Sequence, residues 1–259
     1  MLKLRLLSMV AMAAAVGVAV AAEFAAAQQP PAPPKVSTFA PAEDLVNQLD
    51  KYLGDLDEGT KDEAAYKDAK DNVGKQSNTL IVIALALGLH DEENKYKANA
   101  GAVIKAAQEV AASKDLASAQ KAVAGLKDAV AGKGQAAGAL NWEPTASLAE
   151  LMKQVPIINT KLKMNLKGTK FKSKAKDTQG HTAVLAAIAQ AAMADTKGAK
   201  ADNPEKAKQW YDWSVKARDH AGEVNAAIRA GKSDVAEDAM KKMAQNCDDC
   251  HAVFKPEEK

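Results

Sequence analysis

The sequence predicts an all-α fold, and three features of it support this class. Alanine and lysine dominate the composition, whereas aromatic residues make up only 4% of the chain. Apolar residues recur at steps of three and four in several segments, which places them on one face of a helix. β-branched residues are sparse, and no segment shows the apolar–polar alternation of a strand. We therefore expect helices throughout the folded part.

The N-terminus has the features of a secretory signal in residues 1–27. Two basic residues lie near the start, an apolar run follows from Leu6 to Ala22, and small residues suited to cleavage come after it. The run is also near the length that spans a membrane, so an uncleaved anchor is the alternative. We expect export to the periplasm and no stable membrane span after cleavage. Residues 28–41 are rich in proline and are expected to form an extended linker.

Residues 145–259 are expected to form a four-helix domain. Asn203 and Pro204 are a helix start signal, an N-cap residue followed by proline at the first helical position, and Gly231 is a stop signal. The expected helices are 147–166, 182–195, 203–230 and 233–254. In the last of these, apolar residues recur at alternating steps of four and three, as in the seam of a bundle: Ala236, Met240, Met243, Cys247, Cys250 and Phe254.

Residues 42–135 resemble this domain in outline. Helices are expected near 42–56, 79–89 and 114–130, in an order that parallels the later ones. No cysteine occurs in this half, so it is expected to carry no cofactor. The complete fold expectation is two antiparallel four-helix bundles in tandem, joined by a linker near 131–145 that contains glycine and proline.

The only two cysteines of the chain lie near its end, in the sequence Cys247-Asp248-Asp249-Cys250-His251. This is C-x-x-C-H, the attachment signature of a c-type haem. The two thiols add to the vinyl groups of the porphyrin, and the histidine that follows supplies an imidazole nitrogen to the iron. The motif therefore predicts one covalent haem c, held by Cys247 and Cys250 and ligated by His251.

Two other uses of the motif agree less well with the sequence around it. A redox disulfide of the thioredoxin type normally follows a strand and opens a helix, and no strand is expected before Cys247. A closed zinc site needs four ligands, and the chain has no second C-x-x-C and no H-x-x-x-H pattern. The haem interpretation is therefore the best supported one.

The segment from Thr145 to the end resembles the cytochrome c′ and class II cytochrome c group. Proteins of this group are four-helix bundles whose last helix carries C-x-x-C-H close to its end. An aromatic residue commonly follows three positions after the histidine, and then a basic one; Phe254 and Lys255 occupy those positions here. The resemblance implies that the four C-terminal helices enclose the haem.

The sixth iron ligand is the main question that the resemblance leaves open. In an antiparallel bundle the start of the first helix lies beside the end of the fourth, which places Met152 near the haem. The run 146–152 is also similar to the start of the soluble b-type bundle cytochromes, whose first-helix methionine ligates iron. We expect Met152 to be the sixth ligand. An ordinary core methionine, with an open or apolar distal site, is the alternative.

Other residues of this domain bear on the haem site. Pro156 is expected to kink the helix at Met152, or to start the helix anew and move Met152 out of register. Trp210 and Trp213 are expected either to flank the haem or to pack as ordinary core residues. Two histidines of this half are expected away from the haem: His181 and His220.

The predicted function is single-electron transfer to a redox partner protein, because methionine and histidine ligation keeps iron six-coordinate. One alternative is a five-coordinate iron that binds nitric oxide or carbon monoxide, as cytochromes c′ do. Another is a non-redox haem protein in which the first bundle is a docking module. No catalytic constellation stands out, so we do not expect an enzyme.

The charge of the chain is nearly balanced, with 35 basic and 33 acidic residues and a formal net charge of +2. This balance does not favour a nucleic-acid partner. The lysine-rich segment from Lys167 to Lys176 is either a solvated loop or a surface that steers an acidic partner. The sequence leaves open whether the chain forms a homodimer.

Overall fold

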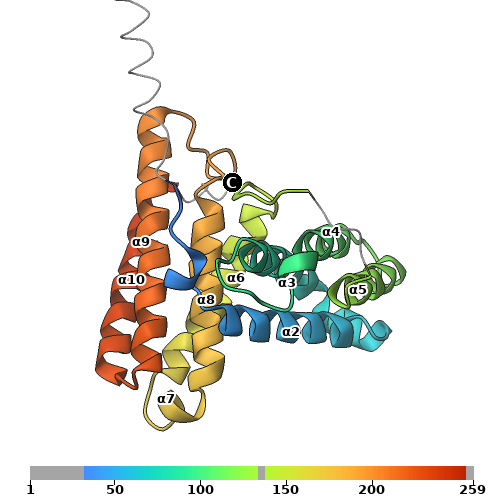
Figure 1. Cartoon of the computed structure of the whole chain (residues 1–259), viewed down its shortest axis with the longest axis horizontal. Coiled ribbons are helices and arrows are strands. Elements are labelled where there is room, and N and C mark those ends of the chain that lie inside the picture. The colour runs from blue at the N-terminus through green and yellow to red at the C-terminus, as the bar shows by residue number, and fades with distance from the viewer. Residues whose placement is uncertain (1–31, 134–137, 255–259) are drawn as a thin grey trace, which may run out of the picture. The chain divides into compact units, whose positions relative to one another are not determined.

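The computed structural model describes residues 32–133 and 138–254 (Figure 1). Within these ranges the chain forms helices and no strands, which confirms the all-α class. The expected signal segment, the first part of the expected linker and Lys255 lie outside the described residues.

In the first group, called the N-terminal helices below, two helices start at side-chain caps. Its members are α2 (Ala42–Gly59), α3 (Glu63–Gly88), α4 (Ala100–Ala111) and α5 (Leu116–Val130). Asp62 caps α3 by accepting a hydrogen bond from the Ala65 amide, and Asp115 forms a capping box with Ser118 at the start of α5. α3 begins well before the expected residue 79. α4 was not predicted, and within the described residues no side chain caps its start.

The second group is called the C-terminal helices. It consists of α6 (Leu148–Asn165), α7 (Lys170–Ser173), α8 (Ala175–Ala192), α9 (Pro204–Arg229) and α10 (Ser233–Phe254). The predicted start of α9 is confirmed, because Asn203 accepts a hydrogen bond from the Lys206 amide at 2.9 Å. Gly231, with φ of +68°, follows the end of α9 as predicted. α8 begins earlier than the expected residue 182, because the lysine-rich segment continues into helix.

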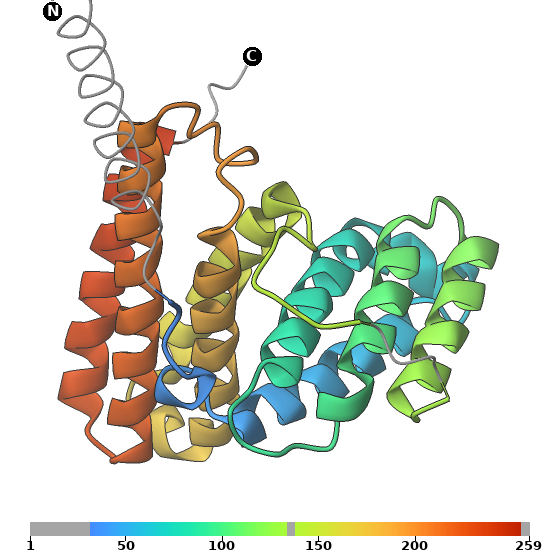
Figure 2. The ribbon, with the colours of Figure 1, turned by 45° about the horizontal axis from the view of Figure 1, so that its top comes forward.

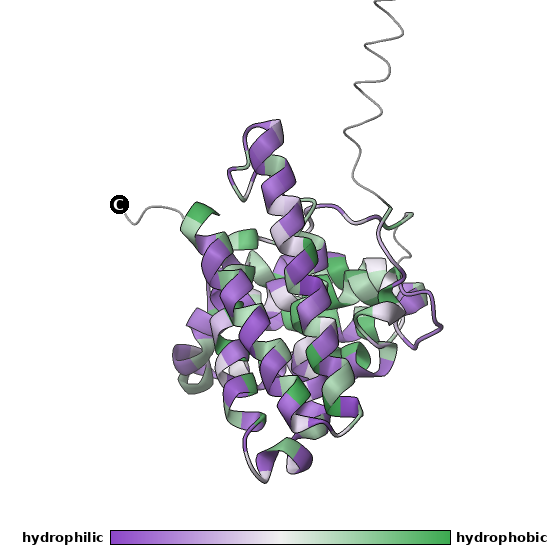
Figure 3. Ribbon diagram, turned by 90° about the vertical axis from the view of Figure 1, so that its left-hand side faces the viewer, coloured by the Kyte–Doolittle hydropathy of each residue, from purple (hydrophilic) through white to green (hydrophobic). Residues whose placement is uncertain are grey.

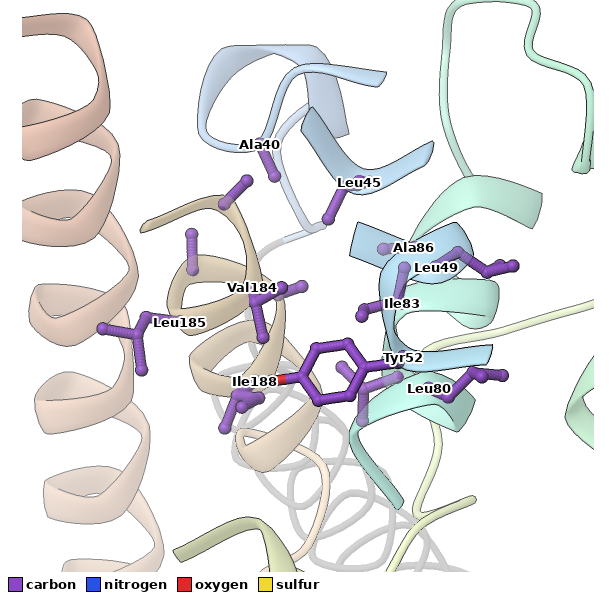
Figure 4. Packing of buried hydrophobic residues seen from close by; sticks show 14 of the residues in the cluster. Ala40, Leu45, Leu49, Tyr52, Leu80, Ile83, Ala86, Val184, Leu185 and Ile188 are labelled. Atoms are coloured by element: carbon purple, nitrogen blue, oxygen red, sulfur yellow. The ribbon is translucent and has the colours of Figure 1, made fainter. Parts of the chain in front are cut away.

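A large hydrophobic core spans both groups. α9 lies between α8 and α10, and the two groups meet where α2 and α3 pack against α8 and α3 packs against α6 (Figure 2). Figure 4 shows Leu45 and Tyr52 of α2 facing Val184 and Ile188 of α8. As a result α8 is buried along most of its length. The division of the chain into two separate bundles stays a prediction.

The end of the expected linker, Val36–Ala40, belongs to the folded core. Val36–Thr38 form a short 3-10 helix, and Phe39 is buried. The carbonyl of Ala40 accepts a hydrogen bond from Nε2 of the buried His90 at 3.1 Å. Burial of these apolar side chains outweighs the extended preference of the neighbouring prolines, so the folded part begins earlier than we expected.

The outward sides of α9 and α10 carry mainly hydrophilic residues (Figure 3). Several of their apolar residues turn inward, as Ala221 and Val224 of α9 and Met240 of α10 show by being buried. Among the described helices, none has both the length and the apolar character needed to cross a membrane.

Candidate functional site

The C-x-x-C-H motif lies in the last turns of α10 rather than at the start of a helix. α10 contains no glycine or proline, and the first part of its apolar seam is buried through Met243. Cys247 and Cys250 continue this seam and are half-buried, whereas His251 is exposed. Because positions three and four apart share a helix face, α10 presents the motif on the side that holds the seam.

These side chains border a cavity of about 90 Å³ lined by α6, α8, α9 and α10. Leu185 and Ile188 of α8, with Trp210 and Trp213 of α9, make most of its wall apolar. The structure thus brings to one cavity the four residues that the sequence assigned to one site: Met152, Cys247, Cys250 and His251.

The cavity lies where the first and last of these helices do not pack closely. Among the described helices, α6 makes its extended contacts with α3, α7 and α8, and α10 makes its extended contact with α9. In an antiparallel bundle the first and last helices are neighbours. Here α6 and α10 both line the cavity, which lies between them.

Both thiols are free in the described part of the chain, and their pKa values are raised. Burial raises the pKa of Cys247, and the nearby Asp248 carboxylate adds a smaller increase. Burial also raises the pKa of Cys250, to about 11, with a contribution from Cys247. Redox-active C-x-x-C pairs show the opposite shift, because a helix N-terminus stabilises the thiolate. This pair therefore lacks the electrostatics of a thioredoxin-type site.

Trp210 forms an aromatic wall at one end of the cavity. Its indole Nε1 donates a hydrogen bond to the Ala192 carbonyl at 2.7 Å, which fixes the ring against the end of α8. Phe254 stands edge-to-face against it, with ring centroids 5.4 Å apart and ring planes at 69°. Cys250 packs against the same small apolar cluster around Trp210. The end of α10 is therefore tied to α9 just beyond His251.

Two amide side chains that the sequence did not single out complete the lining. Asn246 is 5% exposed, and its Nδ2 donates to the Trp213 carbonyl at 3.1 Å. Its Oδ1, and that of Asn159 on α6, are buried with no hydrogen-bond partner in the described part of the chain. Since buried polar atoms are normally hydrogen-bonded, these acceptors indicate that a bound group or water completes the cavity. In the sequence, the only feature that could have pointed to either amide is the position of Asn246 directly before Cys247.

Met152 keeps its helical register despite Pro156. α6 runs from Leu148 to Asn165 with Pro156 inside it, so the alternative in which the helix restarts at the proline is wrong. Met152 is half-buried and, within the described residues, packs against the large core and also against the small apolar cluster around Trp210. Its side chain reaches the cavity as the position on the first turns of the helix predicts.

The other histidines do not line the cavity. His181 is buried in α8 with Nδ1 3.5 Å from Asp177, and burial lowers its pKa to about 4. His220 of α9 contacts Glu223 at 3.1 Å, and His90 holds the N-terminal segment. Over residues 32–133 and 138–254, no group of three or more His, Cys, Asp or Glu side chains is placed to hold a metal ion by itself.

The side chains beside the cavity are of the kinds that hold a c-type haem. Two thiols of one helix face and the adjacent imidazole border an apolar space whose walls include two tryptophans. We compared the chain with family models, curated proteins and solved structures, and none of these comparisons found a match. The resemblance to the class II cytochromes therefore rests on the motif and on the order of the helices.

Proposed function

We propose that the chain is an exported, periplasmic c-type cytochrome similar to the class II group. It would hold one covalent haem between the C-terminal helices and pass single electrons to a redox partner protein. The observation that supports this most is that Cys247, Cys250, His251 and Met152, from two helices, line one apolar cavity. Haem supplies the one-electron chemistry of its iron when it is bound.

The residues of this chain have separate tasks in this proposal. Cys247 and Cys250 hold the porphyrin edge at α10, and His251 supplies an imidazole nitrogen to the iron. Met152 supplies a thioether sulfur from α6. Trp210 and its apolar neighbours on α8 exclude water, which keeps the surroundings similar in both oxidation states.

The arrangement of the helices is part of the same proposal. We infer that α6, α8, α9 and α10 form an antiparallel four-helix bundle, and that α2, α3, α4 and α5 form a second, haem-free one. The core shared by α2, α3, α6 and α8 supports a fixed attachment of the N-terminal helices.

Gas binding is the second candidate, and the apolar lining beside Met152 favours it. Val155, Leu185 and Ile188 line the same cavity and offer no ligand to iron. If Met152 does not ligate, the sixth position of the iron would face such side chains, as the resemblance to cytochromes c′ implies. The absorption spectrum and carbon monoxide binding separate the two candidates.

Covalent attachment is tested by expressing the full chain in an export-competent bacterium with haem-maturation machinery. The wild type should keep its haem through acid–acetone extraction, because thioether bonds survive it. Cys247→Ala and Cys250→Ala should each weaken or abolish retention, and His251→Ala should change the ferrous spectrum. Asp249→Ala, an exposed position inside the motif, is the matched control and should retain haem. Release of the haem from the wild type would show that the proposal is wrong.

A further inference from the structure

α6 has two functional faces. Met152 and Val155 line the cavity. The neighbouring face is buried in the core that α6 shares with the N-terminal helices, and its members are Leu151, Gln154, Ile158 and Leu162. Because both faces belong to one helix, the contacts that hold the buried face also determine where Met152 lies.

Two polar contacts tie α6 to the N-terminal helices on either side of Met152. Asn78 of α3 accepts a hydrogen bond from the backbone amide of Ser147, the N-cap residue of α6, at 2.7 Å. The Asn78 amide nitrogen donates to its own helix, so the orientation of this side chain is fixed. Gln154, two residues after Met152, donates to the Tyr52 hydroxyl of α2 at 2.9 Å.

The contact between Tyr52 and Gln154 is buried, since each residue is 5% exposed. The ring of Tyr52 reaches from α2 toward Ile188 of α8 (Figure 4). Loss of the hydroxyl alone would leave the Gln154 amide nitrogen without a partner at a site closed to water. A buried donor without a partner is unfavourable, so α6 would shift or open to regain one.

We propose that Tyr52 and Asn78 are positioning residues for the haem site: through Gln154 and Ser147, the N-terminal helices hold α6 so that Met152 stays at the cavity. This inference rests on the proposed function for its effect on the iron. It assigns a role to the haem-free half of the chain, which is to support the methionine side of the site. Because α6 and α10 are not in extended contact, α10 does not supply this support.

Hydrogen exchange, followed by mass spectrometry on the full-length protein, tests the support itself and does not depend on haem. Tyr52→Phe and Asn78→Ala should raise exchange about tenfold at α6 amides near Met152, because one buried hydrogen bond is worth about one factor of ten in an opening equilibrium. Exchange in α9 should stay unchanged. Tyr96→Phe is the matched control, because Tyr96 is also buried in this half and its hydroxyl bonds Asp50 instead of α6.

The effect on the site is measured in the haem-loaded protein. Tyr52→Phe should raise the high-spin fraction of the ferric iron, and in the reduced protein it should speed carbon monoxide binding to the ferrous iron by about tenfold, with haem content unchanged. Gln154→Leu in the Tyr52→Phe background should add little, because the two groups form one contact. If Tyr52 had a purely structural role, Tyr52→Phe would lower stability without changing the spin state of the iron. Tyr96→Phe is expected to behave in this way.

The outcomes separate the two proposals. If the wild type holds no covalent haem, the proposed function is wrong, and the exchange experiment still decides whether Tyr52 and Asn78 hold α6. If haem is present but both variants match Tyr96→Phe in exchange and in spin state, the positioning role is overturned. A wild-type iron that is already high-spin would overturn the effect on Met152 ligation.

Discussion

Trp210 and Phe254 meet edge to face, with their ring centroids 5.4 Å apart, three residues beyond His251. Trp210 is itself held by its hydrogen bond to the Ala192 carbonyl. The pair therefore fastens the last turn of α10 to α9 and α8. Without it, the turn that carries Cys250 and His251 would be an exposed helix end, which is where helices fray.

Phe254→Ala should lower the free energy of unfolding by about 2 kcal/mol, because it removes the aromatic pair and part of the apolar burial of Trp210. Urea unfolding measures this change. Val253→Ala is the neighbouring control, since Val253 is 52% exposed and should change stability by less than about 0.5 kcal/mol. Equal effects of the two substitutions would contradict a specific role for the pair.

Local signals explain the parts of the fold that the sequence predicted well. The N-cap at Asn203, the proline after it and the left-handed Gly231 each act within a few residues, so the bounds of α9 could be read directly. The early start of α3 and the burial of Phe39 depend on packing partners far away in the chain. Neither feature produces a periodic pattern in the sequence, so neither could be predicted from it.

The candidate site divides in the same way. The motif on α10 and the position of Met152 on α6 were predicted from spacing and helix order, and the structure places them at one cavity. Asn159 and the Tyr52–Gln154 contact were not predictable. A polar residue on a helix looks the same in sequence whether it faces water or a cavity, and the contact joins residues from opposite halves of the chain.

The Cys250 thiol should react slowly in the haem-free protein. A pKa of about 11 in place of 9.0 lowers the thiolate fraction at pH 8 by about 100-fold. A more basic thiolate is also a better nucleophile, so the net decrease in reaction rate should be roughly tenfold. The rate with a small disulfide reagent should keep rising with pH up to about 11. Mass spectrometry assigns the modified cysteine.

The same protein unfolded in urea is the reference for this rate, because burial no longer acts on its thiols. Its rate should level off about two pH units earlier than that of the folded protein. A folded protein whose rate levels off near pH 7 would instead indicate an activated, thioredoxin-type thiol and would contradict the electrostatics of α10.

His181 should make the protein less stable in acid. Burial lowers its pKa to about 4 from 6.5, opposed by Asp177 and aided by Lys161 and Lys51. As the pH falls, the unfolded state therefore binds a proton at this histidine before the folded state does. The free energy of unfolding should fall by about 3 kcal/mol between pH 6.5 and about pH 4. Urea unfolding of the full-length protein at a series of pH values measures the slope.

His181→Gln should flatten this slope, because glutamine does not titrate. His220→Gln is the control of the same chemical change on α9, outside the core, and should leave the slope as in the wild type. An unchanged slope in His181→Gln would assign the acid sensitivity to another group.

Met152→Ala should turn a low-spin ferric iron high-spin, and after reduction it should open the ferrous iron to carbon monoxide, because no other side chain of α6 at the cavity offers a sulfur or imidazole. Met164→Ala is the matched control: it lies on the same helix, is 50% exposed and should leave the spectrum unchanged. The truncation at Met152 should also lower stability by about 2 kcal/mol through lost packing, so the spectrum and not the stability is the deciding measurement. If the wild type is high-spin and binds carbon monoxide as fast as Met152→Ala does, the methionine is an ordinary lining residue. Gas binding, rather than electron transfer, would then be the function that the apolar walls of α8 and α9 serve.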